Sequence, residues 1–343
     1  MRRAGGIHRK SVTGIQPAVR NPAGFWKEEE RVNRKIVASI AVLLVLILSV
    51  ALAACGSQET TTTAASATGT TAAPSTETTA APSTETSAAT NEKAAAADAA
   101  IAAVTKSPAI ETPPTLKPGV LQAGSDTSFP PMEFSDGKGG YIGFDVDLCT
   151  ALAKKLGLQL EVVSTAWDGI IPALLGDRFD IIMSAMTITE ERLKQINFTD
   201  PYLPGILAIS APLAAPITDA AGLAEKIVGV QVDTTGQFEV EKIQGVKEIK
   251  KYGTILEAFQ DLAAGRVDCV VNDEPVNAYI IETNPDYKAK FANTGKIVTV
   301  NDYGYAVKKE NTALLQALNT ALKELRTEGV YQKICDKWGL TGN

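Results

Sequence analysis

A change in residue composition near position 116 limits where a packed core can form. Residues 56–115 are dominated by Thr, Ala, Ser and Pro, contain no aromatic residue, and repeat Ala-Ala-Pro-Ser-Thr-Glu-Thr at 72–78 and 80–86. Such a segment has too few large apolar side chains to offset the entropy lost on ordering. We therefore expect 55–115 to be a disordered tether, with at most a transient helix in its Ala-rich part.

The charge of the remaining chain excludes several classes of protein. Residues 116–343 carry 22 Lys and Arg against 30 Asp and Glu, which gives a net charge of −8. An acidic domain without a basic face is not suited to binding nucleic acid. The only histidine, His8, precedes the expected core, so His-dependent triads and most zinc hydrolase sites are excluded there. We expect no metal, no cofactor and no nucleic-acid partner.

An uncharged run at 36–54 follows the basic cluster 31–35 and ends at Cys55. A run of this length can span a bilayer, so a permanent membrane anchor is one alternative. The run closes with small residues and lacks a basic flank on its far side, which favours a signal peptide over 32–54. Its ending, Leu-Ala-Ala-Cys, resembles the lipobox of bacterial lipoproteins, in which the cysteine is diacylated and the chain is cut just before it. Two acyl chains on Cys55 would anchor the protein stably.

Residues 1–31 have no evident role ahead of a signal peptide, and we expect them to be a misassigned upstream segment. Translation would then start at Val32, from a GTG codon. Codons for Lys27, Glu28 and Glu29 can form a sequence that resembles a ribosome-binding site.

From 116 onward, short apolar segments alternate with segments of helical apolar spacing. The pattern predicts strands at 120–124, 158–163, 179–184, 227–231 and 267–272, helices at 146–157, 167–175 and 255–264, and a loop at 129–134. This alternation is typical of parallel, doubly wound sheets. Because it restarts at 227, we expect two small α/β lobes. Gly139-Gly140 lacks the spacing of a phosphate-binding loop.

Seven stretches across 118–340 resemble the polar amino-acid-binding proteins of ABC importers, the family 3 extracellular solute-binding proteins. They are 126–131 (Asp-Thr-Ser-Phe-Pro-Pro), 143–148 (Gly-Phe-Asp-Val-Asp-Leu), 167–174 (Trp-Asp-Gly-Ile-Ile-Pro-Ala-Leu), 186–192, 198–202, 265–268 and 303–307. The resemblance implies an α/β, two-lobed periplasmic-binding-protein-like fold of type II. Each lobe would be a sheet flanked by helices, with a two-stranded hinge and the ligand in the cleft. Lobe 1 would comprise 116–206 and 304–343, and lobe 2 would comprise 207–303.

A free amino acid carries an α-carboxylate, which needs a planar double donor and backbone N–H groups when it is buried. The stretch 184–192 fits this need, because a strand ends at its start, Thr189 is a candidate helix cap, and an arginine projects nearby. In the family, the arginine that matches Arg192 clamps the carboxylate, and the residue that matches Thr187 supplies hydroxyl and N–H groups. The alternative is a surface arginine paired with an acidic side chain. The candidate residues are Ser184, Ala185, Met186, Thr187 and Arg192.

The α-ammonium group needs an acceptor, which would couple binding to closure if it came from the other lobe. Asp273 follows a predicted strand and matches the family's Asp-x-Pro motif, whose aspartate binds the ammonium. The alternative is that Asp273 caps the helix before Pro275. Thr234 and Thr235 match a Gly-Thr-Thr turn that donates N–H groups to the carboxylate, although Asp233 stands where glycine is usual.

The ligand's side chain would lie between aromatic rings. Phe129 and Trp167 match family positions that sandwich the ligand, although Trp167 is also compatible with a core role. Asp126 matches a position that accepts hydrogen bonds from the ligand's side chain, and Met132 replaces an aromatic residue. Two aromatic faces suit a guanidinium or a flat amide equally, so arginine-like and glutamine-like ligands both remain open.

The resemblance implies an extracytoplasmic binding protein, not an enzyme, that captures a free polar amino acid and delivers it to an ABC permease in the membrane. We expect a monomer held at the membrane by its lipid anchor. Two alternatives are a cyclohexadienyl dehydratase-like enzyme, with Glu133 or Asp126 as general acid, and the sensing module of a receptor. Three cysteines lie in helix and strand patterns and are expected to be small buried apolar side chains, with one disulfide as an alternative: Cys149, Cys269 and Cys335.

Overall fold

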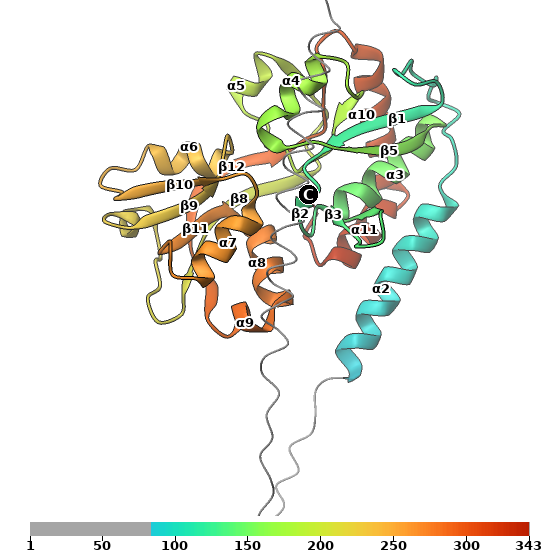
Figure 1. Cartoon of the computed structure of the whole chain (residues 1–343). Coiled ribbons are helices and arrows are strands. Elements are labelled where there is room, and N and C mark those ends of the chain that lie inside the picture. Colours follow the sequence, from blue (N-terminus) through green and yellow to red (C-terminus); the bar gives the residue numbers. More distant parts are fainter. Residues whose placement is uncertain (1–83, 343) are drawn as a thin grey trace, which may run out of the picture. The chain divides into compact units, whose positions relative to one another are not determined.

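The computed structural model describes residues 84–342, which belong to one compact unit (Figure 1). The expectations for 1–31, 32–54, Cys55 and the tether up to 83 lie outside these residues. The first sheet has the strand order β5 (Gln159–Ser164), β1 (Val120–Ser125), β6 (Ile181–Ile182), β13 (Ala306–Lys308) and β7 (Ile196–Phe198). The second sheet has the order β10 (Glu248–Tyr252), β9 (Ile227–Gln231), β11 (Cys269–Asp273), β8 (Leu203–Pro212) and β12 (Phe291–Tyr303).

A small third sheet includes both ends of the segment expected to be a loop at 129–134, and residues 130–132 between them form a turn. It pairs β2 (Ser128–Phe129), β3 (Glu133–Ser135) and β4 (Tyr141–Ile142) in antiparallel register. These strands are two or three residues long, which is too short for an alternating apolar pattern to be recognised in the sequence.

The two large sheets are mixed, so the prediction of parallel sheets is correct for only some of the strand pairs. β1 is parallel to β5 and β6, but β13 is antiparallel to both of its neighbours. The reason is that the chain leaves the first lobe through β8 and returns through β12. These two long strands pair with each other in antiparallel fashion, from Tyr303 opposite Leu203 to Phe291 opposite Pro212. They form the two-stranded connection between the lobes.

Helices flank both sheets. In lobe 1 they are α3 (Phe144–Leu156), η1 (Trp167–Gly169), α4 (Ile170–Leu175), α5 (Glu190–Leu193), α10 (Thr312–Thr327) and α11 (Val330–Trp338). In lobe 2 they are η2 (Ala220–Leu223), α6 (Thr235–Glu241), α7 (Ile255–Ala263), α8 (Glu274–Thr283) and α9 (Pro285–Lys288). Side chains alternate across a strand. Ile181 therefore packs in the core that contains residues of α3 and α10, whereas Ile182 packs in the core that contains residues of α4.

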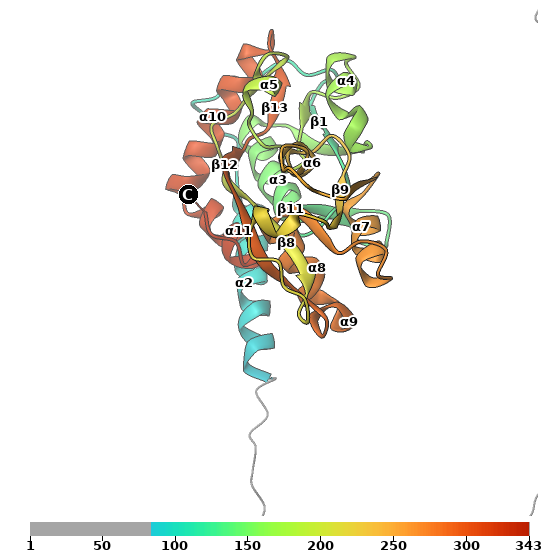
Figure 2. The same ribbon diagram turned by 90° about the vertical axis from the view of Figure 1, so that its left-hand side faces the viewer.

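The N-terminal helix α2 (Thr84–Ala103) corrects the expected extent of the tether. It packs against α11 and α3, and Figures 1 and 2 both show it beside α11. Ala97 and Ile101 are buried, and Lys337 forms an ion pair with Asp98. The Lys154 ammonium donates to the carbonyls of Ile101 and Ala102, two of the acceptors that a helix end leaves unpaired. Tertiary contacts thus order an Ala-rich helix that its own composition would leave marginal.

The segment after α2 is also part of the folded unit. Ile110 is buried in the lobe 1 core, the Ser107 hydroxyl donates to Glu324, and the Thr112 hydroxyl donates to the Leu156 carbonyl. The prediction of disorder is therefore wrong for 84–115 and remains a prediction for 55–83.

Cys149, Cys269 and Cys335 are free, buried thiols, as expected for small apolar side chains. No helix within 84–342 is long and apolar enough to cross a membrane.

Candidate functional site

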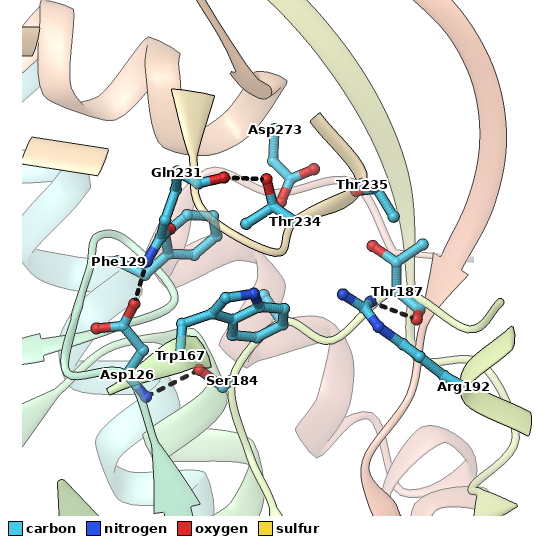
Figure 3. Close-up of a pocket in the computed structure, with 11 residues that line it drawn as sticks. Asp126, Phe129, Trp167, Ser184, Thr187, Arg192, Gln231, Thr234, Thr235 and Asp273 are labelled. Atoms are coloured by element: carbon cyan, nitrogen blue, oxygen red, sulfur yellow. Dashed lines mark hydrogen bonds between the residues drawn. The ribbon is translucent and has the colours of Figure 1, made fainter. Parts of the chain in front are cut away.

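A cavity lies where the two lobes face each other, and the empty space in it and at its open mouth is about 300 Å³ (Figure 3). Ten of the eleven ligand-site residues expected from the sequence line it, together with Gln231. Lobe 1 contributes Asp126, Phe129, Trp167, Ser184, Ala185, Thr187 and Arg192, and lobe 2 contributes Gln231, Thr234, Thr235 and Asp273. Residues more than a hundred positions apart in the chain thus converge on one site.

Arg192 supplies a buried cation on the lobe 1 side. It lies in the short helix α5, whose first turn is capped by the Thr189 hydroxyl, as predicted. Its Nη1 donates to the Thr187 carbonyl at 2.8 Å, and only 8 % of the residue is exposed. Burial lowers the pKa of Arg192 to about 10, and the charge of Asp273 partly offsets this. No ion pair joins Arg192 to a surface carboxylate in the described residues, so the surface-arginine alternative does not hold.

Asp273 supplies a buried carboxyl on the lobe 2 side. It is the last residue of β11 and precedes α8, yet its side chain makes no capping hydrogen bond in the described structure. The helix-cap alternative is therefore not what the geometry supports. Burial raises the pKa of Asp273 to about 7, and Tyr303 and Arg192 partly offset this effect. The groups around Asp273 therefore compensate its charge only in part.

The turn before α6 presents Thr234 and Thr235 to the cavity. The Thr234 hydroxyl accepts from the Gln237 N–H and donates to the Gln231 carbonyl, so it caps α6 and fixes the turn. Asp233 has a φ of 56°, in the left-handed region that glycine adopts most easily. Aspartate tolerates this region better than most residues, so the turn keeps its form without glycine.

Two aromatic rings form the middle of the cavity. Trp167 is half-buried and its Nε1 donates to the Asp233 carbonyl at 2.9 Å, which joins the two lobes. The Arg192 guanidinium carbon lies 5.1 Å from the centre of the Trp167 ring, within cation–π range. Because this ring lines the cavity and bridges the lobes, it is more than a core side chain. Phe129, which is buried, provides the second ring.

Gln231 lines the cavity but was not among the residues expected from the sequence. Its Nε2 donates to Asp126 Oδ2 at 2.6 Å and to the Gly253 carbonyl at 3.1 Å (Figure 3). Asp126 also accepts from the Ser128 hydroxyl at 2.6 Å. The sequence did carry a signal, because Gln231 is a polar residue at the carboxyl end of a buried strand, where open α/β sheets bind ligands.

Met186 was expected in the site but does not line the cavity. Its side chain is fully buried against Ile170, Ile196 and other residues of the core beside α4, and its carbonyl accepts from the Gly304 N–H. A long apolar side chain gains more from burial in the core than at a polar cavity. Its neighbours Ser184 and Ala185 form the cavity floor instead.

The chain is similar to known proteins over most of its length. Residues 121–341 match the model of the bacterial extracellular solute-binding proteins, family 3. The ABC transporter arginine-binding protein 1 of Escherichia coli (strain K12) is 33% identical over 222 residues, which is 64% of this chain and 90% of that protein.

Two solved structures share the fold. A structure of an ancestral arginine-binding protein bound to arginine has a TM-score of 0.62 and 40% identity, covering 64% of this chain and 98% of that one. A second structure, of an ancestral arginine-binding protein bound to glutamine, has a TM-score of 0.62 and 41% identity. It covers 65% of this chain and 98% of that one. The two-lobed architecture is therefore that of the type II periplasmic binding proteins. With its fold, its interlobe cavity and a family match over most of its length, the chain belongs to the bacterial extracellular solute-binding proteins of family 3.

Proposed function

We propose that this protein captures a free amino acid in the interlobe cavity and delivers it to an ABC importer. The observation that carries the proposal is the pair of buried opposite charges, Arg192 from lobe 1 and Asp273 from lobe 2, at one cavity. An amino-acid zwitterion supplies the complement of both. Its carboxylate would meet Arg192 and Thr187, and its ammonium would meet Asp273. Micromolar affinity requires about −8 kcal/mol, and three charge-assisted contacts at roughly 1.5–3 kcal/mol each provide much of it.

The ligand's side chain would extend between Phe129 and Trp167 toward Asp126 and Gln231. This end of the cavity offers a carboxylate and an amide beside flat aromatic faces, which suits arginine or glutamine. The binding of arginine and glutamine by related proteins supports the same two candidates. An acidic side chain would meet the Asp126 carboxylate and be rejected.

The test is a thermal-unfolding screen of the protein against the twenty amino acids, followed by calorimetry. A ligand that binds only the folded state raises the melting temperature. We expect arginine and glutamine to raise it most. Agmatine, which lacks the carboxylate, and N-acetylarginine, which lacks the ammonium, should both bind far more weakly than arginine. If no amino acid shifts the transition, the proposed function is wrong.

A binding role without chemistry is part of the proposal. The ionisable side chains of the cavity are Asp126, Arg192 and Asp273, and Asp126 is held as an acceptor by Ser128 and Gln231. In the proposed complex Asp273 would accept from the ligand's ammonium, so all three groups would orient the ligand. Phenylpyruvate formation from prephenate or arogenate would reveal the dehydratase alternative instead.

The anchoring of the protein is a second part of the proposal, because Cys55 lies outside the described residues. We expect Cys55 to be diacylated and to hold a monomer on the extracytoplasmic face of the membrane. Cys55→Ser should release the protein into the soluble fraction with unchanged ligand affinity, because the site lies wholly within the folded unit that begins near α2. A membrane-bound Cys55→Ser protein would contradict lipid anchoring at this residue.

A further inference from the structure

Two carboxyl groups lie in the core directly behind the cavity floor. Glu133, in β3, and Asp145, in the first turn of α3, are both fully buried. The Ser184 hydroxyl donates to Glu133 Oε1 at 2.7 Å, and the Ala185 N–H donates to Asp145 Oδ2 at 2.8 Å. Each carboxyl therefore holds one residue of the floor that the ligand would contact.

The surroundings of this pair contain no compensating charge. The ionisable groups that face it are all acids: Asp126, Cys149, Tyr202, Tyr303 and Tyr305. Across residues 84–342, no lysine or arginine forms an ion pair with either carboxyl. Two ionised carboxylates here would be two unpaired buried charges, so at most one of them is ionised at neutral pH.

The geometry also locates the remaining proton. Glu133 Oε2 and Asp145 Oδ1 are buried, and no N–H or O–H group of the described residues donates to either. Glu133 and Asp145 accept hydrogen bonds from the adjacent residues Ser184 and Ala185, so the two carboxyls lie close together. A proton on Glu133 that is donated to Asp145 would satisfy one unpaired oxygen of each carboxyl. In agreement, burial raises the pKa of Glu133 well above its usual range.

The charge that stays on Asp145 has a structural task. Ala185 has a φ of 40°, a conformation that is sterically disfavoured for a residue with a Cβ atom. Its N–H donates to Asp145, which also accepts from the Tyr202 hydroxyl at 2.9 Å. Hydrogen bonds to an ionised acceptor are stronger than neutral ones, so they can hold this backbone in place.

We propose that Glu133 and Asp145 share one proton and act as positioning residues of the ligand site, through Ser184 and Ala185. This inference rests on the proposed function for its effect on binding, but the shared proton is independent of the ligand's identity. Neither residue lines the cavity, so neither would touch the ligand.

The shared proton is tested by infrared spectroscopy of the full-length protein at neutral pH. Glu133→Gln replaces the protonated carboxyl by an amide that can make the same two hydrogen bonds. The difference spectrum of the parent minus Glu133→Gln should contain the C=O stretch of a protonated carboxyl. Asp147→Asn is the matched control, because Asp147 lies in the same helical turn but pairs with Lys337 and Trp338, and it should leave this band unchanged. A difference spectrum without the band would overturn the shared proton.

The positioning role is tested by calorimetry with arginine. Glu133→Gln should bind within about threefold of the parent, whereas Glu133→Leu, which removes the acceptor for Ser184, should bind about tenfold more weakly. Asp145→Asn keeps the shape and removes the charge, so it should also lose about tenfold even if Glu133→Leu does not fold. Equal affinity for the parent and Asp145→Asn would overturn the positioning role. A parent that shows the infrared band but binds no amino acid would contradict the proposed function alone.

Discussion

The two lobes contribute to the cavity in different ways. Lobe 1 provides seven of the lining residues, including Arg192, both aromatic rings and Asp126, whereas lobe 2 provides four, including Asp273. Among the described residues, two side-chain hydrogen bonds cross between them at the cavity, from Trp167 to the Asp233 carbonyl and from Gln231 to Asp126. In the proposed complex, lobe 1 would therefore contact most of the ligand, and lobe 2 would close over it with the opposite charge.

This difference explains why a ligand with two charges suits the site. Burial disfavours the charged form of Arg192 and of Asp273, which lowers the pKa of the first and raises the pKa of the second. A ligand that carries only one charge would compensate one lobe and leave the other uncompensated. In the proposed complex a zwitterion would compensate both, and would do so fully only with the lobes closed.

Asp273→Asn should show most clearly whether the two lobes contribute opposite charges to binding. It removes the charge that lobe 2 contributes to the cavity and keeps the shape of the side chain. We expect affinity for amino acids to fall about a hundredfold, because a charge-assisted contact in a buried site is lost. Small-angle scattering at saturating ligand should show a partly open protein.

Glu274→Gln is the matched control for this change. Glu274 is adjacent in sequence but pairs with Lys296 near the surface, so affinity and closure should stay as in the parent. If Asp273→Asn binds and closes like the parent, another group holds the ammonium and the division of charge between the lobes is wrong.

Arg192→Lys tests the contribution of lobe 1 to binding. Lysine keeps the charge but loses the planar fork, so affinity should fall about thirtyfold for every amino acid, with little change in preference among them. Scattering should still show a closed complex, because Asp273 is intact. A change in preference, with the affinity for one amino acid retained, would place Arg192 at the ligand's side chain instead.

The pH dependence of binding should come from lobe 2. Asp273 can counter the ammonium only when it is ionised, and burial raises its pKa to about 7. Binding is therefore at full strength above this pH and should weaken as the pH falls below 7, by up to about tenfold per unit. Calorimetry from about pH 8 to pH 5 measures this slope. The same slope in Asp273→Asn would assign it to a different group.

A substitution in α2, which does not line the cavity, should have the smallest effect on binding. Ile101→Ala removes a buried side chain between α2 and lobe 1, so the free energy of unfolding should fall by about 2 kcal/mol. Ligand affinity should not change. Asp98→Asn, which removes a largely exposed partner of Lys337, is the control and should cost less stability. Denaturant unfolding measures both, and a loss of affinity in Ile101→Ala would link α2 to the site.

Much of the fold and site was accessible from sequence because it depends on local pattern. The strands near 120, 159, 227 and 269 and the helices near 146, 170 and 255 follow apolar periodicity, and they are present. The polar residues that line the cavity lie at strand ends and helix starts, which local signals mark. Met186 was expected to line the cavity, but its side chain points into the core. Adjacent residues of the chain can point to either side, and contacts with residues distant in sequence determine which side each one faces.

The sequence by itself determined the two α/β units and the acidic character of the domain. It also determined the opposite charges of Arg192 and Asp273, each of which follows a predicted strand. Only the tertiary structure decided three other features. α2 is ordered because α11 and Lys154 supply contacts that its composition does not predict. Gln231 meets Asp126, and Glu133 meets Asp145, because the sheets bring together residues that are far apart in the chain. The physical reason is the same in each case: burial and pairing across long sequence separations are properties of packing, and local periodicity does not encode them.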